Sequence, residues 1–134
     1  MNPADPLTPH TKKSSNRLVS SIGHSLRGFR HAVVNERAVQ QVTIALLVLV
    51  PLSTLLPVSN LEHLLLVLSV MLIVLVELMN SAVETTLDRV STELHELSKR
   101  AKDMASAAVF VAVLMAGLTW AVIAGPLLVK LIRA

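Results

Sequence analysis

Four polar side chains, Glu77, Asn80, Glu84 and Asp88, follow a long apolar run at intervals of three or four residues. At about 100° per residue on an α-helix, they fall within roughly a quarter of the circumference, and apolar residues occupy most of the remaining surface. An acidic stripe on a membrane helix is costly to insert, so it is by default a candidate functional site.

The residue types restrict the chemistry of this stripe. Carboxylates this close together repel one another unless a cation or a proton lies between them. Oxygen ligands without cysteine favour Mg²⁺ or another hard ion, which typically takes one or two carboxylates plus substrate phosphates. Further along the chain, Arg100 and Lys102 provide cations for phosphate oxygens. The sequence contains neither a glycine-rich phosphate loop nor an HExxH zinc motif, and the spacing alone supports a proton or cation pathway about as well as an enzyme.

Each member of the stripe also has a simpler interpretation. Glu77 is the deepest, and its alternative is a protonated carboxyl that forms a hydrogen bond between subunits. Asn80 belongs to a residue type that commonly joins membrane helices, and Glu84 and Asp88 are cheap to keep solvated near the surface. Beyond the stripe, Asp103 followed by small residues is typical of a helix N-cap.

The composition identifies an integral membrane protein. Apolar residues make up 53% of the 134 positions, too many for a soluble domain of this length, and they are concentrated in three runs. The absence of cysteine rules out disulfides and Cys-ligated metals. Because three helices alone bury little core, a homo-oligomer is expected.

The elements that must position the stripe follow from these runs. A single membrane domain spans residues 16–134, after a Pro- and Ser-rich tail that is expected to be disordered and cytoplasmic and that carries no apolar signal sequence. The expected elements are a tail at 1–15, a surface helix at 16–35, and membrane spans at 38–56, 63–87 and 104–129.

The expected surface helix has apolar residues on one face and basic residues around the others, which is typical of a helix that lies on anionic lipid. Glu36 breaks this pattern: either the chain turns there, or its carboxylate faces a site. In the third span, small residues recur at four-residue steps from Ala108 to Ala116 and from Gly117 to Gly125, which predicts close helix packing.

Charge sets the predicted orientation. Lys and Arg cluster before the first span and between the second and third, so the N-terminus and the 88–103 segment are expected to be cytoplasmic. Lys130 and Arg133 at the outer end run against this bias. At about 1.5 Å per residue, Glu77 would lie about 10 Å beneath the cytoplasmic boundary of a hydrocarbon layer about 30 Å thick.

Two segments carry a specific resemblance. The sequence VELMNSAVETTLDRV, followed by ELHELSKRAKDMASAAV, resembles the signature of the prokaryotic diacylglycerol kinase family, and VVNERA and GFR resemble its upstream segments. The likeness extends from about Arg17 to Trp120. It implies an all-α homotrimer in the bacterial inner membrane, each chain with an amphipathic surface helix and three transmembrane helices. The implied reaction converts Mg·ATP and sn-1,2-diacylglycerol to ADP and phosphatidic acid at the cytoplasmic face, as part of lipid recycling. No nucleic acid partner is expected.

The resemblance also implies roles for individual residues. Glu77 would be the general base on the lipid hydroxyl, and Glu36 and Glu84 would hold Mg²⁺ on the ATP phosphates. The implied ATP-binding residues are Arg17, His24, Glu36, Asn80, Glu84, Asp88, Glu93, Leu94, His95, Lys102 and Asp103. The implied lipid-binding residues are Arg17, Arg30, Gln41, Glu77, Ser106 and Trp120.

Four positions depart from the family pattern. His24, Leu26 and Arg27 stand where Tyr, Trp and Lys are common, and Val42 replaces a polar residue near the lipid. A sister branch of the family phosphorylates undecaprenol, and that activity is the alternative. The loop sequence ELHELSKRAKDM is more similar to the diacylglycerol branch.

Overall fold

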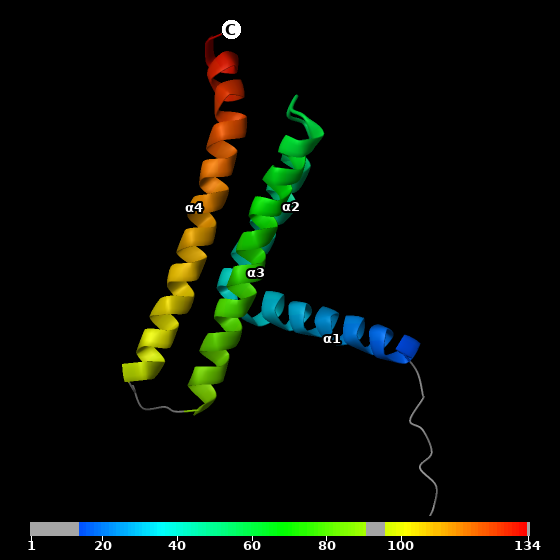
Figure 1. Ribbon diagram of the computed structural model, residues 1–134, viewed down its shortest axis with the longest axis vertical. Helices are drawn as coiled ribbons and strands as arrows, with labels where there is room; N and C mark the ends of the chain where they lie inside the picture. The colour runs from blue at the N-terminus through cyan, green and yellow to red at the C-terminus, as the bar shows by residue number, and fades with distance from the viewer. Residues whose placement is uncertain (1–13, 91–95, 134) are drawn as a thin grey trace, which may run out of the picture.

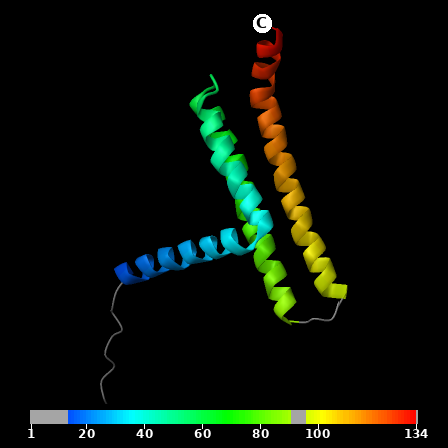
Figure 2. The ribbon, with the colours of Figure 1, turned by 180° about the vertical axis from the view of Figure 1, so that it is seen from behind.

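The computed structural model describes residues 14–90 and 96–133, and all the elements in these ranges are helices. They are α1 (Ser14–Asn35), α2 (Arg37–Thr54), α3 (Asn60–Val90) and α4 (Glu96–Arg133). Helices α2, α3 and α4 run alongside one another, whereas α1 projects away from them (Figures 1 and 2). Three of the four, α2, α3 and α4, are long and apolar enough to cross a membrane.

A one-residue break at Glu36 separates α1 from α2. The backbone there is extended, with φ −108° and ψ 111°, and α2 begins at the next residue. The Gln40 side chain bridges the break by donating a hydrogen bond to the Val34 carbonyl at 3.1 Å. Of the two interpretations that the sequence left open for Glu36, the chain does turn here. Glu36 also lines a cavity described below, and whether its carboxylate serves a site stays a prediction.

The connection between α2 and α3 contains a helix-starting motif. Helix α2 ends at Thr54, two residues before the expected boundary, and contains Pro51. Ser59 and Glu62 form a capping box: the Ser59 backbone N–H and hydroxyl both donate to the Glu62 carboxylate at 2.7 Å, and the Ser59 hydroxyl accepts from the Glu62 N–H at 3.3 Å. This reciprocal pair fixes where α3 begins.

The end of α3 and the start of α4 differ from the prediction. Helix α3 continues to Val90 and α4 already begins at Glu96, so most of the expected 88–103 loop is helical. Asp103 lies in the second turn of α4, so its alternative interpretation as a helix N-cap is wrong. The polar residues from Glu96 onward extend α4 beyond its apolar part, and an exposed helical turn has the same composition as a loop.

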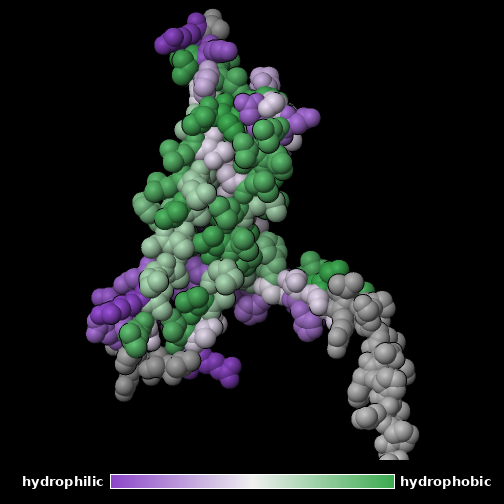
Figure 3. Space-filling model, viewed as in Figure 1, coloured by the Kyte–Doolittle hydropathy of each residue, from purple (hydrophilic) through white to green (hydrophobic). Residues whose placement is uncertain are grey.

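Helix α3 lies at the centre of the bundle. It packs against α2 on one side and α4 on the other, whereas α2 and α4 do not contact each other. The fully buried apolar side chains are few, and Leu66 and Val70 of α3 are among them. Figure 3 shows a hydrophobic band along the bundle with hydrophilic residues gathered toward its two ends, the distribution of a membrane-spanning bundle.

The prediction from small residues is confirmed only in part. Ala112 and Ala116 of α4 are buried, as close packing requires, but Ala108 and Gly117 are exposed. In the part of the chain that the structure describes, no side chain lies within 4 Å of a Cβ built on Gly117 or on Gly125. Within one chain, close helix contact therefore uses the alanines and not the glycines.

Candidate active site

The acidic stripe of α3 continues the face by which this helix packs. The buried residues of α3 are Leu66, Val70, Val74, Glu77 and Ser81, spaced by four, four, three and four positions. Only 5% of Glu77 is exposed, although it carries a carboxyl group. A carboxyl group in a helix-packing face is costly to bury, so its presence indicates a functional site.

One turn toward the end of α3, Asn80 and Glu84 form a hydrogen bond. The Asn80 amide nitrogen donates to a Glu84 carboxylate oxygen at 3.1 Å, and both side chains are partly buried. The other end of the amide, Oδ1, is a buried oxygen that has no hydrogen-bond partner among the described residues. This oxygen and the Glu84 carboxylate are hard acceptors that suit a cation or a donor from outside the described residues.

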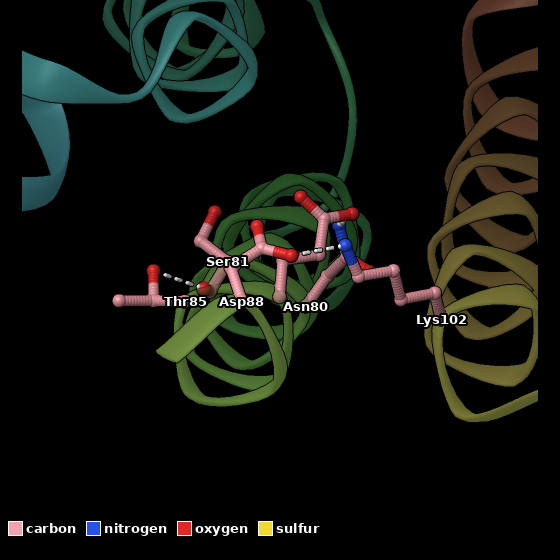
Figure 4. A network of polar contacts seen from close by, with 6 residues as sticks. Asn80, Ser81, Thr85, Asp88 and Lys102 are labelled. Carbon is pink, nitrogen blue, oxygen red and sulfur yellow. Dashed lines mark hydrogen bonds and ion pairs between the residues drawn. The ribbon is translucent and has the colours of Figure 1, made fainter. Parts of the chain in front are cut away.

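An ion pair connects the end of the stripe to α4. Lys102 Nζ lies 2.5 Å from Asp88 Oδ1, and Figure 4 shows Lys102 reaching across from α4 to α3. The Lys102 and Asp88 side chains keep 39% and 66% of their exposure, so the pair contributes little to stability. It places a cation beside the stripe, where an anionic ligand can reach it.

The flank of the stripe that is turned away from Lys102 faces α1. Ser81 and Thr85 lie on this side in Figure 4, and the Thr85 hydroxyl donates to the Ser81 carbonyl at 2.8 Å. Both residues line a cavity of about 540 Å³, together with Phe29, His31 and Glu36. Sequence analysis missed Ser81, which is buried. Its spacing of four residues from Glu77, which puts it near the same helix face, was the signal that could have found it.

The two carboxylates predicted to hold Mg²⁺ thus occupy different environments. Glu36 lines the cavity between α1 and α3, whereas Glu84 is hydrogen-bonded to Asn80 and does not line that cavity. Within the described ranges, no three or more His, Cys, Asp or Glu side chains come close enough to hold a metal ion. Because Mg²⁺ commonly uses only one or two carboxylates with substrate phosphates, Glu84 and the free Asn80 oxygen still fit such an ion.

The other predicted site residues are dispersed. On α1, His24 contacts Arg27 at 3.1 Å, and Arg30 lines a shallow cavity with Arg27. Gln41, Asp103 and Ser106 are exposed on α2 and α4. Arg17 belongs to α1, but the structure does not describe its side chain. Glu93, Leu94 and His95 lie outside the described residues.

Trp120 lies far from the acidic stripe. It is about 27 Å beyond Lys102 along α4, at about 1.5 Å per residue, and it lines an apolar groove with Leu52 and Leu56. It therefore lies within reach of lipid chains and distant from the polar end of the bundle.

Known proteins are similar to this chain over most of its length. A family model described as prokaryotic diacylglycerol kinase matches residues 23–124. A diacylglycerol kinase of Pseudomonas aeruginosa is 48% identical over 107 residues, which cover 80% of this chain and 87% of the relative. That of Escherichia coli K12 is 44% identical over 107 residues, 80% of this chain and 88% of the relative. That of Helicobacter pylori 26695 is 38% identical over 112 residues, which cover 84% of this chain and 88% of the relative.

Proposed function

The chain belongs to the prokaryotic diacylglycerol kinase family of enzymes, and we propose that it transfers the γ-phosphoryl group of ATP to the free hydroxyl of a diacylglycerol. The products are ADP and phosphatidic acid. The observation that carries the proposal is the buried Glu77 carboxyl, placed on the same face of α3 as Glu84 and the Asp88–Lys102 pair. This face runs from the apolar interior to the polar end of the bundle, as a lipid alcohol and a nucleotide require.

In the proposed reaction, the lipid hydroxyl oxygen attacks the γ-phosphorus of ATP. The new P–O bond forms as the bond to the β-phosphate oxygen breaks, and the hydroxyl proton passes to the Glu77 carboxylate. Phosphoryl transfer depends mainly on positioning and on neutralising phosphate charge, and Lys102 supplies a cation for this purpose. Turning from Asp88 to a phosphate would cost this lysine little, because the pair is partly exposed.

The proposed metal is Mg²⁺, which would neutralise phosphate charge when bound with ATP. Glu84 and Glu36 would hold it, with the unpaired Asn80 oxygen directed at the metal or its water. Since Glu36 and Glu84 occupy different environments in one chain, Glu36 of one copy could serve the site of another. The separation of the two carboxylates within one chain supports a site shared between copies in the proposed homotrimer.

We place the site at the cytoplasmic face of the inner membrane, with α1 as an amphipathic helix on the lipid surface. On α1, apolar side chains such as Val19, Ile22 and Leu26 are exposed, as contact with a bilayer surface requires. Because the chain has no cysteine, single cysteines at Ser98 and Ser59 can test this orientation with a membrane-impermeant thiol reagent. Labelling of Ser98→Cys from the outside of intact cells would contradict it.

The decisive experiment measures the lipid product. Purified protein in mixed micelles receives radiolabelled ATP and either diacylglycerol or undecaprenol, with Glu77→Gln as the inactive control. Label in phosphatidic acid supports the proposal, and label only in undecaprenyl phosphate would reassign the enzyme to the sister activity. Ion flux into liposomes without ATP, with no labelled lipid, would favour a proton or cation pathway instead.

A further inference from the structure

A second site lies at the other end of the bundle, away from the Asp88–Lys102 pair. Helices α2 and α4 do not contact each other, and a groove of about 600 Å³ lies between them near their far ends. Leu52, Leu56, Ala124 and Leu128 contribute to its apolar wall, and Lys130 is the one charged residue that lines it. The volume is in the range of ligand sites, and an apolar wall with one cation suits an amphiphile.

The distance along α4 separates this groove from the proposed active site. At about 1.5 Å per residue, Lys130 lies about 42 Å beyond Lys102, which matches the bilayer thickness of about 40–45 Å with its headgroups. The two lysines therefore stand at opposite membrane surfaces. A lipid with its headgroup at Lys130 belongs to the leaflet opposite the Glu77 site and is not the lipid that reacts there.

The charges at this end specify the headgroup. Lys130 and Arg133 are the only Lys or Arg residues of the chain after Lys102, and they lie three positions apart in the last turn of α4. Neither forms an ion pair within the described residues, and the nearby acid at this end, Glu62, is engaged by Ser59. Cations next to an apolar groove attract a lipid headgroup with a net negative charge, which also accounts for two positive charges on the side that the charge bias leaves poor in them.

The groove also suits the acyl part of such a lipid. Trp120 lines its inner end, about 15 Å from Lys130 along the helix. A phosphate at Lys130 would therefore place acyl chains against Leu56, Ala124 and the Trp120 ring. The family match ends at residue 124, so Leu127, Leu128 and Lys130 belong to a part of α4 beyond the matched segment.

We propose that this groove binds an anionic phospholipid of the leaflet opposite the active site, with its phosphate at Lys130 and Arg133. This site takes no part in the kinase reaction, so its occupancy is tested by measuring how much lipid stays bound to the purified protein. The full chain is purified in detergent, and native mass spectrometry compares retention of phosphatidylglycerol with phosphatidylcholine of the same acyl chains.

The first test removes the charge. Lys130→Gln should lower phosphatidylglycerol retention about fivefold, the effect of one cation near a lipid phosphate, and leave phosphatidylcholine retention unchanged. The matched control is Lys99→Gln, the same change at an exposed position near the other end of α4. An equal loss in both variants would show that only total charge matters and would overturn the proposal.

The second test fills the groove. Ala124→Phe should reduce retention of both lipids, whereas Val122→Phe, on the exposed side of α4, should not. Wild-type lipid retention in Ala124→Phe would refute the site. If that variant instead changes the number of copies per complex and leaves lipid retention unchanged, the groove holds a second copy of the chain and the lipid proposal fails.

Discussion

The two halves of α3 present side chains of opposite character at the same spacing on the same face. In the first half, Leu66, Val70 and Val74 are buried and apolar. In the second half, the same face carries Glu77 and Ser81, also buried, and then Glu84 and Asp88 as the helix approaches the polar end. Helix packing therefore fixes the positions of the buried residues on this face, and residue type alone distinguishes those that only pack from those that could carry chemistry.

This difference suggests how the site is kept rigid. The apolar half of the face anchors α3 between α2 and α4, so the carboxylates in the second half inherit a fixed geometry without a supporting loop. Sites on helices are held more precisely than sites on loops. Substitutions in the two halves should then affect different properties: those in the polar half should lower activity, and those in the apolar half should lower stability.

The largest effect is expected at Glu77. Glu77→Gln keeps the side-chain volume but removes the proposed base, so turnover should fall by about 10²–10⁴-fold while ATP binding persists. The unfolding midpoint should not fall, because a neutral amide is cheaper to bury than a carboxylate. Turnover is measured with radiolabelled ATP and diacylglycerol in mixed micelles.

Glu62→Gln is the matched control for this change, because it makes the same substitution in the exposed first turn of α3. It should leave turnover near the wild-type level. Near-normal activity in Glu77→Gln would remove this residue as the base and reduce its role to packing.

The apolar half should respond in stability. Leu66 has no exposed surface, and Leu66→Ala should lower the free energy of unfolding by about 2 kcal/mol, near the lower bound for such truncations. The lower bound applies because lipid is as apolar as leucine, so the truncation loses little hydrophobic free energy and mainly loses packing contacts. Unfolding by a denaturing detergent is followed by circular dichroism, and turnover per folded molecule should remain.

Leu68→Ala makes the same truncation two positions away, where the side chain is half exposed. Its effect should be much smaller. Equal losses of stability in the two variants would mean that this face of α3 is not the packing face in the membrane.

The third expected effect concerns the metal. Glu84→Gln should raise the apparent KM for Mg·ATP about tenfold, with a smaller change in kcat, because it removes a charged ligand of the nucleotide-bound ion. Glu96→Gln, an exposed acid that pairs with Arg100, is the control. If the Mg²⁺ dependence of Glu84→Gln and of Glu36→Gln is unchanged, the proposed ligand assignment is wrong.

The sequence predicted the helices and their order because three apolar runs of membrane-spanning length leave few alternatives. It also predicted the acidic stripe, because a helical repeat needs no tertiary information. It misplaced the start of α4 because the exposed turns from Glu96 to Asp103 are as polar as a loop.

What failed depended on relations between helices. Ala112 and Gly117 belong to the two different series of small residues on α4, and nothing in the spacing of either series reveals which one faces α3. Likewise, the resemblance assigned Glu36 and Glu84 to one ion, but it could not show that Glu36 lines a cavity on the α1 side of α3. Such facts arise from packing and are invisible to a local pattern.

The smallest effect is expected where the polar half meets α4. A double-mutant cycle with Asp88→Asn and Lys102→Gln, measured on the free energy of unfolding, should give a coupling free energy below about 1 kcal/mol, because both side chains are partly exposed. This coupling should decrease further in high salt, which screens exposed charges. The exposed Glu96–Arg100 pair within α4 provides the reference, with an expected coupling of about 0.3–0.5 kcal/mol. A coupling of several kcal/mol at Asp88–Lys102 would make this pair a structural clamp, and Lys102 would then be held too firmly to turn toward a phosphate. A weak coupling would leave the lysine free to exchange one anion for another, which is what a nucleotide site at the end of this helix face requires.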